Sequence, residues 1–191
     1  MQSHNQTAPG DLEDVRRFIN TWSIPNDTRI ETDYLPLLAC DPDAWLRDLS
    51  LCPRHSSDSL ATLTALRRDL RKSCDGSDVN SEQLNAWFKR VALSVQVESN
   101  GVTPALRVKP ADGTYIAHIL GNVANAIASG QWSRLKICGD CQWSFYDHTR
   151  NGSKRWCGMT KGGPNGRACG TIAKVSAFRS RAAARASALE N

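Results

Sequence analysis

The sequence contains no apolar run of about 18 residues, the length that a helix needs to cross a bilayer. Its start, MQSHNQTAPG, has neither the basic flank nor the apolar centre of a signal peptide. We therefore expect a soluble, cytoplasmic protein without a membrane partner.

Motifs of common enzyme sites are also missing. There is no GxxxxGK[ST] or GxGxxG phosphate loop and no GxSxG nucleophile elbow. His55 stands alone in a loop sequence, and His118 lies among apolar residues of a helical pattern. Asp41 and Asp43 lie at the start of an expected helix, where capping explains them. We expect no enzymatic function.

The chain lacks the even number of cysteines that a disulfide framework would use. Seven cysteines without an export signal favour reduced thiols. Three of them, Cys40, Cys52 and Cys74, are scattered and are interpreted as ordinary free thiols. The other four lie close together in the last third of the chain: Cys138, Cys141, Cys157 and Cys169.

Acidic residues are scarce in the same C-terminal third. From Gln131 onward there are eleven bases and three acids, a charge of +8, whereas the preceding residues carry thirteen bases and sixteen acids, a charge of −3. No acid occurs between Asp147 and Glu190. This asymmetry indicates a polyanion-binding segment attached to a mildly acidic body.

The spacing of apolar residues predicts a mainly α fold with one β-hairpin. Helices are expected over residues 11–22, 41–49, 57–74, 81–90 and 114–129. The segment 23–36 is predicted to be a loop. Alternation at Leu93, Val95 and Val97 and again at Leu106 and Val108, around the Asn100-Gly101 turn, predicts the hairpin. The predicted divisions are a flexible tail 1–10, a helical domain 11–130 and a C-terminal module 131–191.

The four clustered cysteines predict a closed zinc site. Their spacing is C-x2-C-x15-C-x11-C, and no βαβ pattern of a thioredoxin-like redox site surrounds the first pair. Gly139 is expected to ease the tight turn of that pair. His148 is the poorer alternative ligand. Four thiolates would leave no open coordination position, so one structural zinc ion is expected to fold the module. The aromatic residues Trp143, Phe145, Tyr146 and Trp156 are expected to form its small core.

The run CGDCQWSFYDHTRNGSKRWC, followed by CGTIAKVSAFRSR, resembles the CGNR zinc-finger family. That family has a cysteine pair, an F-x-D-x-S/T-R-N stretch, an R/K-R-W-C step and a C-G-N-R motif that enters a basic helix. The preceding body is similar to the family's N-terminal ABATE-type domain of stress-induced transcription regulators, including the stretch Phe18-Ile19-Asn20-Thr21. The resemblance implies a bacterial-type regulator whose N-terminal domain senses a small molecule or a protein.

The chain departs from the family pattern in two places. Thr171 and Ile172 stand where the family has Asn and Arg, which puts DNA binding through this motif in question. The segment GMTKGGPNGRA between the third and fourth cysteines is longer than the usual spacer. It is interpreted as a flexible insertion.

The tail AKVSAFRSRAAARASAL favours a helix because it is rich in alanine and has no Gly or Pro. At 100° per residue, its bases form a stripe, and the neighbouring edge with Val175 and Ala182 is expected to pack on the finger. The predicted nucleic-acid-binding residues are Arg150, Lys154, Arg155, Lys174, Arg179, Arg181 and Arg185.

The favoured function is a DNA-binding transcriptional regulator whose zinc is structural. Two alternatives stay open. The zinc module could bind an acidic protein partner through its basic surface, or it could bind RNA if Trp143 and Tyr146 are exposed for base stacking.

Overall fold

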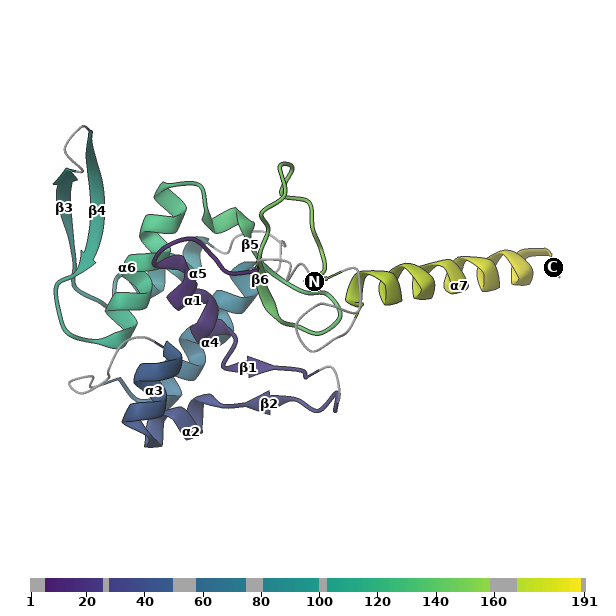
Figure 1. Cartoon of the computed structure of the whole chain (residues 1–191), viewed down its shortest axis with the longest axis horizontal. Coiled ribbons are helices and arrows are strands. Elements are labelled where there is room, and N and C mark those ends of the chain that lie inside the picture. Colours follow the sequence, from purple (N-terminus) through teal and green to yellow (C-terminus); the bar gives the residue numbers. More distant parts are fainter. Residues whose placement is uncertain are drawn as a thin grey trace.

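The structure is a computed structural model that describes residues 6–25, 28–49, 58–74, 81–99, 103–158 and 168–189. Its helices are α1 (Leu12–Ile19), α2 (Leu35–Cys40), α3 (Pro42–Leu49), α4 (Leu60–Cys74), α5 (Ser81–Phe88), α6 (Tyr115–Ala128) and α7 (Cys169–Leu189). The strands form three antiparallel pairs: β1 (Trp22–Ser23) with β2 (Thr32–Asp33), β3 (Leu93–Ser99) with β4 (Pro104–Pro110), and β5 (Leu135–Ile137) with β6 (Ser144–Tyr146). The prediction of a mainly helical fold with a hairpin is confirmed (Figure 1).

The core of the body lies where α1, α4 and α6 meet. Helical spacing places Val15 and Phe18 of α1, Leu66 of α4 and Ile119 of α6 in this core, and each of these side chains is fully buried. Tyr115 lies edge-on to the ring of Phe18, with ring centroids 5.5 Å apart. Burial of each large apolar side chain contributes about 1.5–3 kcal/mol.

Two elements at the start of the chain differ from the prediction. Helix α1 ends at Ile19 rather than at Trp22 because the Thr21 hydroxyl donates to the Phe18 carbonyl oxygen (2.8 Å) and the chain turns into β1. The predicted loop over residues 23–36 was wrong in part, since it contains β1–β2 and the start of α2. In α3, Asp41 caps the helix as predicted, accepting from the backbone N–H of Ala44 (3.0 Å).

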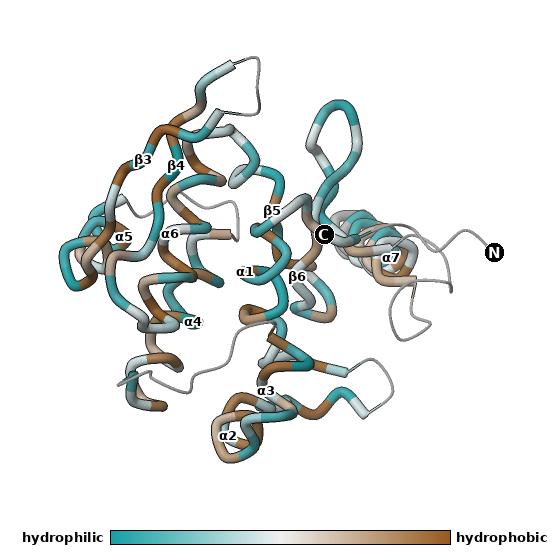
Figure 2. The backbone as a smooth tube through the Cα atoms, turned by 60° about the vertical axis from the view of Figure 1, so that its left-hand side comes forward, coloured by the Kyte–Doolittle hydropathy of each residue, from teal (hydrophilic) through white to brown (hydrophobic). Residues whose placement is uncertain are grey.

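The β3–β4 hairpin extends beyond the body (Figure 1). It pairs Val95 with Val108 and Val97 with Leu106. Both strands carry brown, apolar segments in Figure 2, yet Val95, Val97 and Leu106 are each about two-thirds exposed. The alternation therefore identified the strands correctly, but the apolar face is not part of the core. Asn125 of α6 fixes the hairpin by accepting from the Val108 N–H (2.8 Å) and donating to the Val108 carbonyl (2.9 Å).

The β5–β6 pair packs directly on the body. Leu135, Ile137 and Tyr146 belong to the same apolar core as α1, α4 and α6. The predicted boundary near residue 130 coincides with the turn that ends α6, where Gly130 has a φ of +72°. The two predicted domains therefore share a core across this turn.

The sequence predicts a flexible tail over residues 1–10, but residues 6–8 make specific contacts. The Gln6 carbonyl accepts from the Tyr146 N–H (3.1 Å), and the Gln6 side-chain amide donates to the Cys157 carbonyl (2.6 Å). Ala8 is buried. These contacts place the segment against the C-terminal module.

Several predictions concern residues outside the described ranges: those for Cys52, His55, the Asn100-Gly101 turn and the insertion between Gly158 and Ala168. None of the described helices combines the length and the apolarity that crossing a bilayer requires.

Candidate metal centre

Four cysteine sulfur atoms converge at the end of the β5–β6 pair. The Sγ atoms of Cys138, Cys141, Cys157 and Cys169 all lie within 4.8 Å of one another, and all four side chains are buried. The Cys141 and Cys157 sulfurs are 3.5 Å apart, and those of Cys157 and Cys169 are 3.7 Å apart. Sulfurs bound to one tetrahedral zinc at about 2.3 Å would lie about 3.8 Å apart. The cluster thus has the dimensions of a four-thiolate zinc site.

The first two cysteines lie on a tight knuckle after β5. The Cys138 N–H donates to the Trp143 carbonyl (2.9 Å), and the Gln142 N–H donates to the Cys138 carbonyl (3.0 Å). The left-handed residue of this turn is Gln142, with a φ of +60°, and not Gly139 as the sequence predicts. Gly139 instead donates its N–H to the Arg155 carbonyl (3.2 Å). This bond links the knuckle to the loop that precedes Cys157.

The other two cysteines bring in the loop and the last helix. Cys169 is the first residue of α7 and is fully buried. The next N–H, that of Gly170, donates to the Gly158 carbonyl (2.9 Å), so the residue that follows Cys157 is joined to the first turn of α7 beside the cluster. Phe145 is buried against the four cysteines, with Trp143 and Trp156 packed around them. Three of the four aromatics predicted for this small core are therefore in it, whereas Tyr146 belongs to the body core.

The acidities of the four thiols are linked by their proximity. Hydrogen bonds from the Cys141 and Cys157 thiols lower the pKa of Cys138. The hydrogen bonds that Cys141 and Cys157 donate to Cys138 raise their own pKa values, and burial raises the pKa of Cys169. One negative charge therefore opposes the formation of the next, unless a cation lies among the sulfurs.

The donor set fits zinc. Thiolates are the ligands that zinc prefers in structural sites, and four of them complete its tetrahedral shell. His148 lies elsewhere: its ring is exposed, and its Nε2 atom is 2.8 Å from the Thr7 carbonyl oxygen. The arrangement is consistent with one structural zinc ion held by the four cysteines, which would tie β5, the loop before Cys157 and α7 together.

Comparison with protein families agrees with this geometry. Residues 134–182 match the family model described as CGNR zinc finger. The C-terminal part of the chain is a CGNR zinc finger. A comparison with curated protein sequences finds no match. The family match covers the finger and not the preceding ABATE-type similarity, which stays a prediction.

The loop of the CGNR finger is organised around Asp147, whose side chain is fully buried. Its carboxylate accepts from the Thr149 N–H (2.9 Å), the Thr149 hydroxyl (2.6 Å) and the Lys154 N–H (2.8 Å), and it lies 3.5 Å from the Lys136 ammonium. Burial alone would raise the pKa of Asp147, but these hydrogen bonds and Lys136 lower it to about 2. The carboxylate's stabilising effect is complete above about pH 4 and is lost as the pH falls through about 2.

Two bases support the same loop: Arg134, which directly precedes β5, and Lys136 of β5. Arg134 donates to the carbonyl oxygens of Asp147, Thr149 and Arg150, and Lys136 donates to that of Gly152. Gly152 has a φ of +57°, and a Cβ atom there would lie 3.7 Å from the Arg134 guanidinium. Arg134 and Lys136, which count toward the basic charge of the segment, therefore shape the loop from inside.

The predicted nucleic-acid-binding residues divide into two groups. Arg150, Lys154 and Arg155 of the loop and Lys174 of α7 line one cavity of about 350 Å³ beside Cys157. Arg179, Arg181 and Arg185 lie farther along α7 and are exposed. The structure brings the first four together and leaves the last three on a separate stretch of helix.

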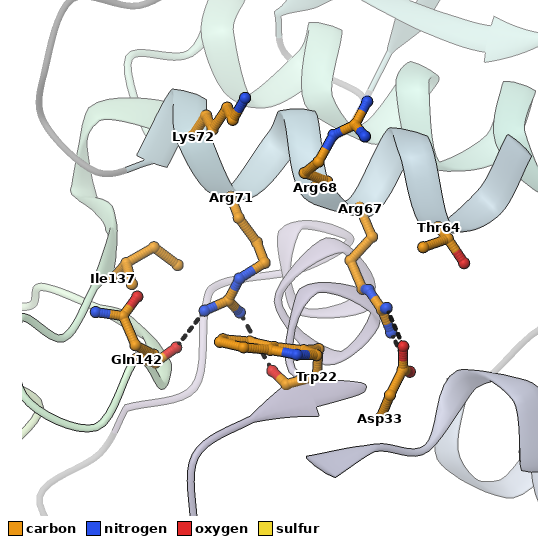
Figure 3. A pocket seen from close by; sticks show the side chains of 9 residues that line it. All are labelled: Trp22, Asp33, Thr64, Arg67, Arg68, Arg71, Lys72, Ile137 and Gln142. Atoms are coloured by element: carbon orange, nitrogen blue, oxygen red, sulfur yellow. Dashed lines mark hydrogen bonds and ion pairs between the residues drawn. The ribbon is translucent and has the colours of Figure 1, made fainter. Parts of the chain in front are cut away.

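Side chains of the body that sequence reasoning did not assign hold the finger in place. Asn20 accepts from the Ser144 N–H (2.7 Å) and donates to the Ser144 carbonyl (3.0 Å). Arg71 of α4 donates to the Gln142 carbonyl (2.7 Å) and to those of Ile19 (3.1 Å) and Trp22 (3.2 Å), as Figure 3 shows for Gln142 and Trp22. Asn20 lies in the stretch Phe18-Ile19-Asn20-Thr21, which was the available signal.

The metal site generates a first prediction. The purified chain should hold one zinc ion, measured by atomic emission, and Cys169→Ser should lose it, because three thiolates leave the tetrahedral shell open. Since zinc contributes about 10–16 kcal/mol to folding in small zinc modules, the variant should also lose helical signal from α7. Cys40→Ser, at an exposed cysteine outside the cluster, is the control and should keep its zinc. Full zinc retention in Cys169→Ser would mean that another group is the fourth ligand.

The Asn20 contact generates a second prediction, for which Asn125 is the matched control. Each amide pairs with both backbone groups of one residue, so each alanine variant should lower the free energy of unfolding by about 1–3 kcal/mol in urea titrations. Only Asn20→Ala should speed zinc extraction by 4-(2-pyridylazo)resorcinol, because Asn125 holds the hairpin and not the finger. Equal extraction rates in the two variants would show that the body does not support the metal site.

Proposed function

We propose that the chain is a zinc-dependent DNA-binding transcriptional regulator. The observation that carries this proposal is the basic pocket, the cavity of about 350 Å³ lined by Arg150, Lys154, Arg155 and Lys174. None of the described residues that line it is acidic. Thr149, Asn151 and Ser153 add uncharged hydrogen-bonding groups to its wall. Such a pocket suits a phosphate group of a nucleic-acid backbone.

Helix α7 extends this basic surface away from the body. In Figure 1 it projects from the finger without a neighbouring element along most of its length. The sequence predicts that the edge of α7 with Val175 and Ala182 packs on the finger, but Val175 is 42% exposed and Ala182 is exposed as well. That packing prediction was wrong: among the α7 residues whose burial the structure describes, Cys169 and Gly170 at the start of the helix are the buried ones.

The composition of α7 favours a polyanion as its partner. It contains Lys174, Arg179, Arg181 and Arg185 and no acid. A helix of 21 residues is about 30 Å long and fits the major groove of DNA, which is about 12 Å wide. An isolated helix is marginally stable in water, and phosphates along one side would stabilise it.

In this proposal the zinc ion is structural and the chain is not an enzyme. The four thiolates would fill the coordination shell, so zinc would not activate water or a substrate. Its contribution is to fix the start of α7 at Cys169 relative to the loop that carries Arg150 and Lys154. The body, whose side chains Asn20 and Arg71 hold the finger, would respond to an effector and alter this arrangement.

A third prediction tests DNA binding directly. Affinity for mixed-sequence duplex DNA, measured by fluorescence anisotropy from 50 to about 300 mM salt, should fall steeply because phosphate contacts release counterions. Arg181→Ala with Arg185→Ala should reduce the slope of log K against log salt by about 2, one unit for each lost contact. Lys89→Ala, an exposed base on the body, should leave the slope unchanged. A flat salt response, or no binding at 50 mM salt, refutes the proposal.

A fourth prediction concerns Asp147, where loss of a negative charge should weaken DNA binding. In Asp147→Asn, one carboxylate oxygen becomes an NH₂ group that faces backbone N–H donors of Thr149 or Lys154, so the basic loop should lose its conformation. The same duplex assay should show an affinity about 5- to 150-fold lower, since a displaced buried acceptor costs about 1–3 kcal/mol. Asp48→Asn removes an exposed acid of the body and should not weaken binding. Unchanged affinity in Asp147→Asn would show that the loop does not contact DNA.

One observation favours a second function, an acidic protein partner. Ile172, Val175 and Phe178 are exposed along α7 beside its bases. If the chain binds an acidic protein instead of DNA, duplex binding would be at background in the same assay. The Arg181 and Arg185 variants would then lower only the capture of that protein. The RNA alternative has less support, because Tyr146 is 8% exposed and Trp143 packs against the cysteine cluster.

A further inference from the structure

The β3–β4 hairpin has one apolar and one polar face, because side chains alternate along each strand and the register aligns the two patterns. The apolar face carries Ser99 and otherwise Leu93, Val95, Val97, Pro104, Leu106, Val108 and Pro110. The polar face carries Ser94, Gln96, Glu98, Ala105, Arg107 and Lys109. Glu98 forms ion pairs within that face with Lys109 (2.5 Å) and Arg107 (3.7 Å). All charged side chains of the two strands therefore lie on one side of the hairpin.

Helix α6 packs against the base of the hairpin. Asn125 pairs with both backbone groups of Val108, and a Cβ atom at Gly121 would lie 3.4 Å from the Val108 carbonyl oxygen. Toward the tip, Val95, Val97 and Leu106 are each about two-thirds exposed, and Figure 1 shows this part extending away from the helices. An antiparallel pair normally packs its apolar face on other apolar groups. In the described part of the chain, the outer half of this face is in water instead.

The size and chemistry of the apolar face favour a second copy of this chain as its partner. Each strand has seven residues, so the face is about 23 Å long and about 10 Å wide. A hairpin of the same dimensions covers such a face completely, whereas a small molecule covers part of it and a charged partner finds no counter-charge on it. We propose that two copies of the chain form a dimer by packing the apolar faces of their β3–β4 hairpins against each other.

Face-to-face packing explains the exposed side chains better than pairing along a strand edge. If β3 paired edge to edge with β3 of a second copy, the enlarged sheet would still have Val95, Val97 and Leu106 in water. Two layers at the usual separation of about 10 Å remove these side chains from water in both copies. A two-stranded hairpin is only marginally stable in water, so the second layer also stabilises it.

The charges of the hairpin are compatible with this dimer. Glu98, Arg107 and Lys109 lie on the outer face of each hairpin, so the dimer brings no like charges together between the layers. Helix α7 is the contrasting case. Its exposed apolar residues Ile172 and Phe178 share a helix with four bases and no acid, so two α7 helices would repel each other.

The area of the face sets the strength of the dimer. Each copy would bury a few hundred Å², so the total lies below the roughly 1,200 Å² at which stable interfaces begin. We therefore expect a dissociation constant in the micromolar range, on the order of 10–100 µM. The dimer does not rest on the proposed function, because DNA contacts none of the residues that form it. Loss of duplex binding with a retained dimer would refute the regulator and not this interface.

The test is the mass of the zinc-loaded full chain, measured by sedimentation equilibrium in a buffer without nucleic acid. Between about 1 and about 500 µM protein, the mass should rise from the 21.0 kDa of one chain toward twice that value. The mass of a single chain at the highest concentration overturns the proposal, since the face then has another occupant. Growth beyond two chains overturns the closed pairing.

Two variants of the hairpin locate the interface. Val97→Thr with Leu106→Thr changes a cross-strand pair on the apolar face and keeps β propensity in both strands. The added hydroxyls should weaken the dimer at least about tenfold. Gln96→Thr with Ala105→Thr, at exposed positions of the polar face, is the matched control and should associate like the unmodified chain. Equal dissociation constants in the two variants overturn the assignment.

A third variant and a measurement without substitution complete the test. Phe178→Ser on α7 should leave the dissociation constant unchanged, and loss of the dimer there would place the interface on α7 and overturn the proposal. In the unmodified chain, hydrogen exchange of the backbone amides of β3 and β4 should be severalfold slower at about 500 µM than at about 5 µM protein. Exchange that does not depend on concentration, in a chain whose mass shows a dimer, excludes the hairpins from the interface.

Discussion

Mutual repulsion among four buried thiolates is the constraint on which the C-terminal third of the chain depends. Each sulfur raises the energy of the next negative charge, and a divalent cation offsets all four together. Once it does, β5, the loop around Asp147 and the start of α7 are fixed to one point. The short strands and the small aromatic cluster around Phe145 would not fix them alone, because so little apolar surface is buried.

The finger also depends on the body. Leu135, Ile137 and Tyr146 are buried in the core formed by α1, α4 and α6, and Asn20 pairs with both backbone groups of Ser144. The metal thus orders one side of the β5–β6 pair, and the body orders the other. A change in the body can reach the metal centre through contacts of known atoms, Arg71 to the Gln142 carbonyl above all.

Much of this arrangement could be predicted from local patterns. Helical spacing located α4 and α6, alternation located the β3–β4 hairpin, and cysteine spacing located the metal cluster. Each of these signals is a regular spacing between residues that are near one another in the sequence. The contacts that Asn20 and Arg71 make with the finger could not be predicted, because their partners there are backbone groups more than 70 residues away in sequence and carry no side-chain signal. The exposure of Val95 and Val175 was not predictable either, since a pattern of apolar residues does not say whether another element covers it.

The position of Cys169 as both zinc ligand and first residue of α7 has a mechanical consequence. The helix extends about 30 Å from the cysteine that would bind the metal. If the helix axis tilted by about 10° at Cys169, its far end would move by about 5 Å, which is close to the rise of one helical turn. Small changes in the geometry of the cysteine ligands would therefore be magnified into shifts of several ångströms at Arg185.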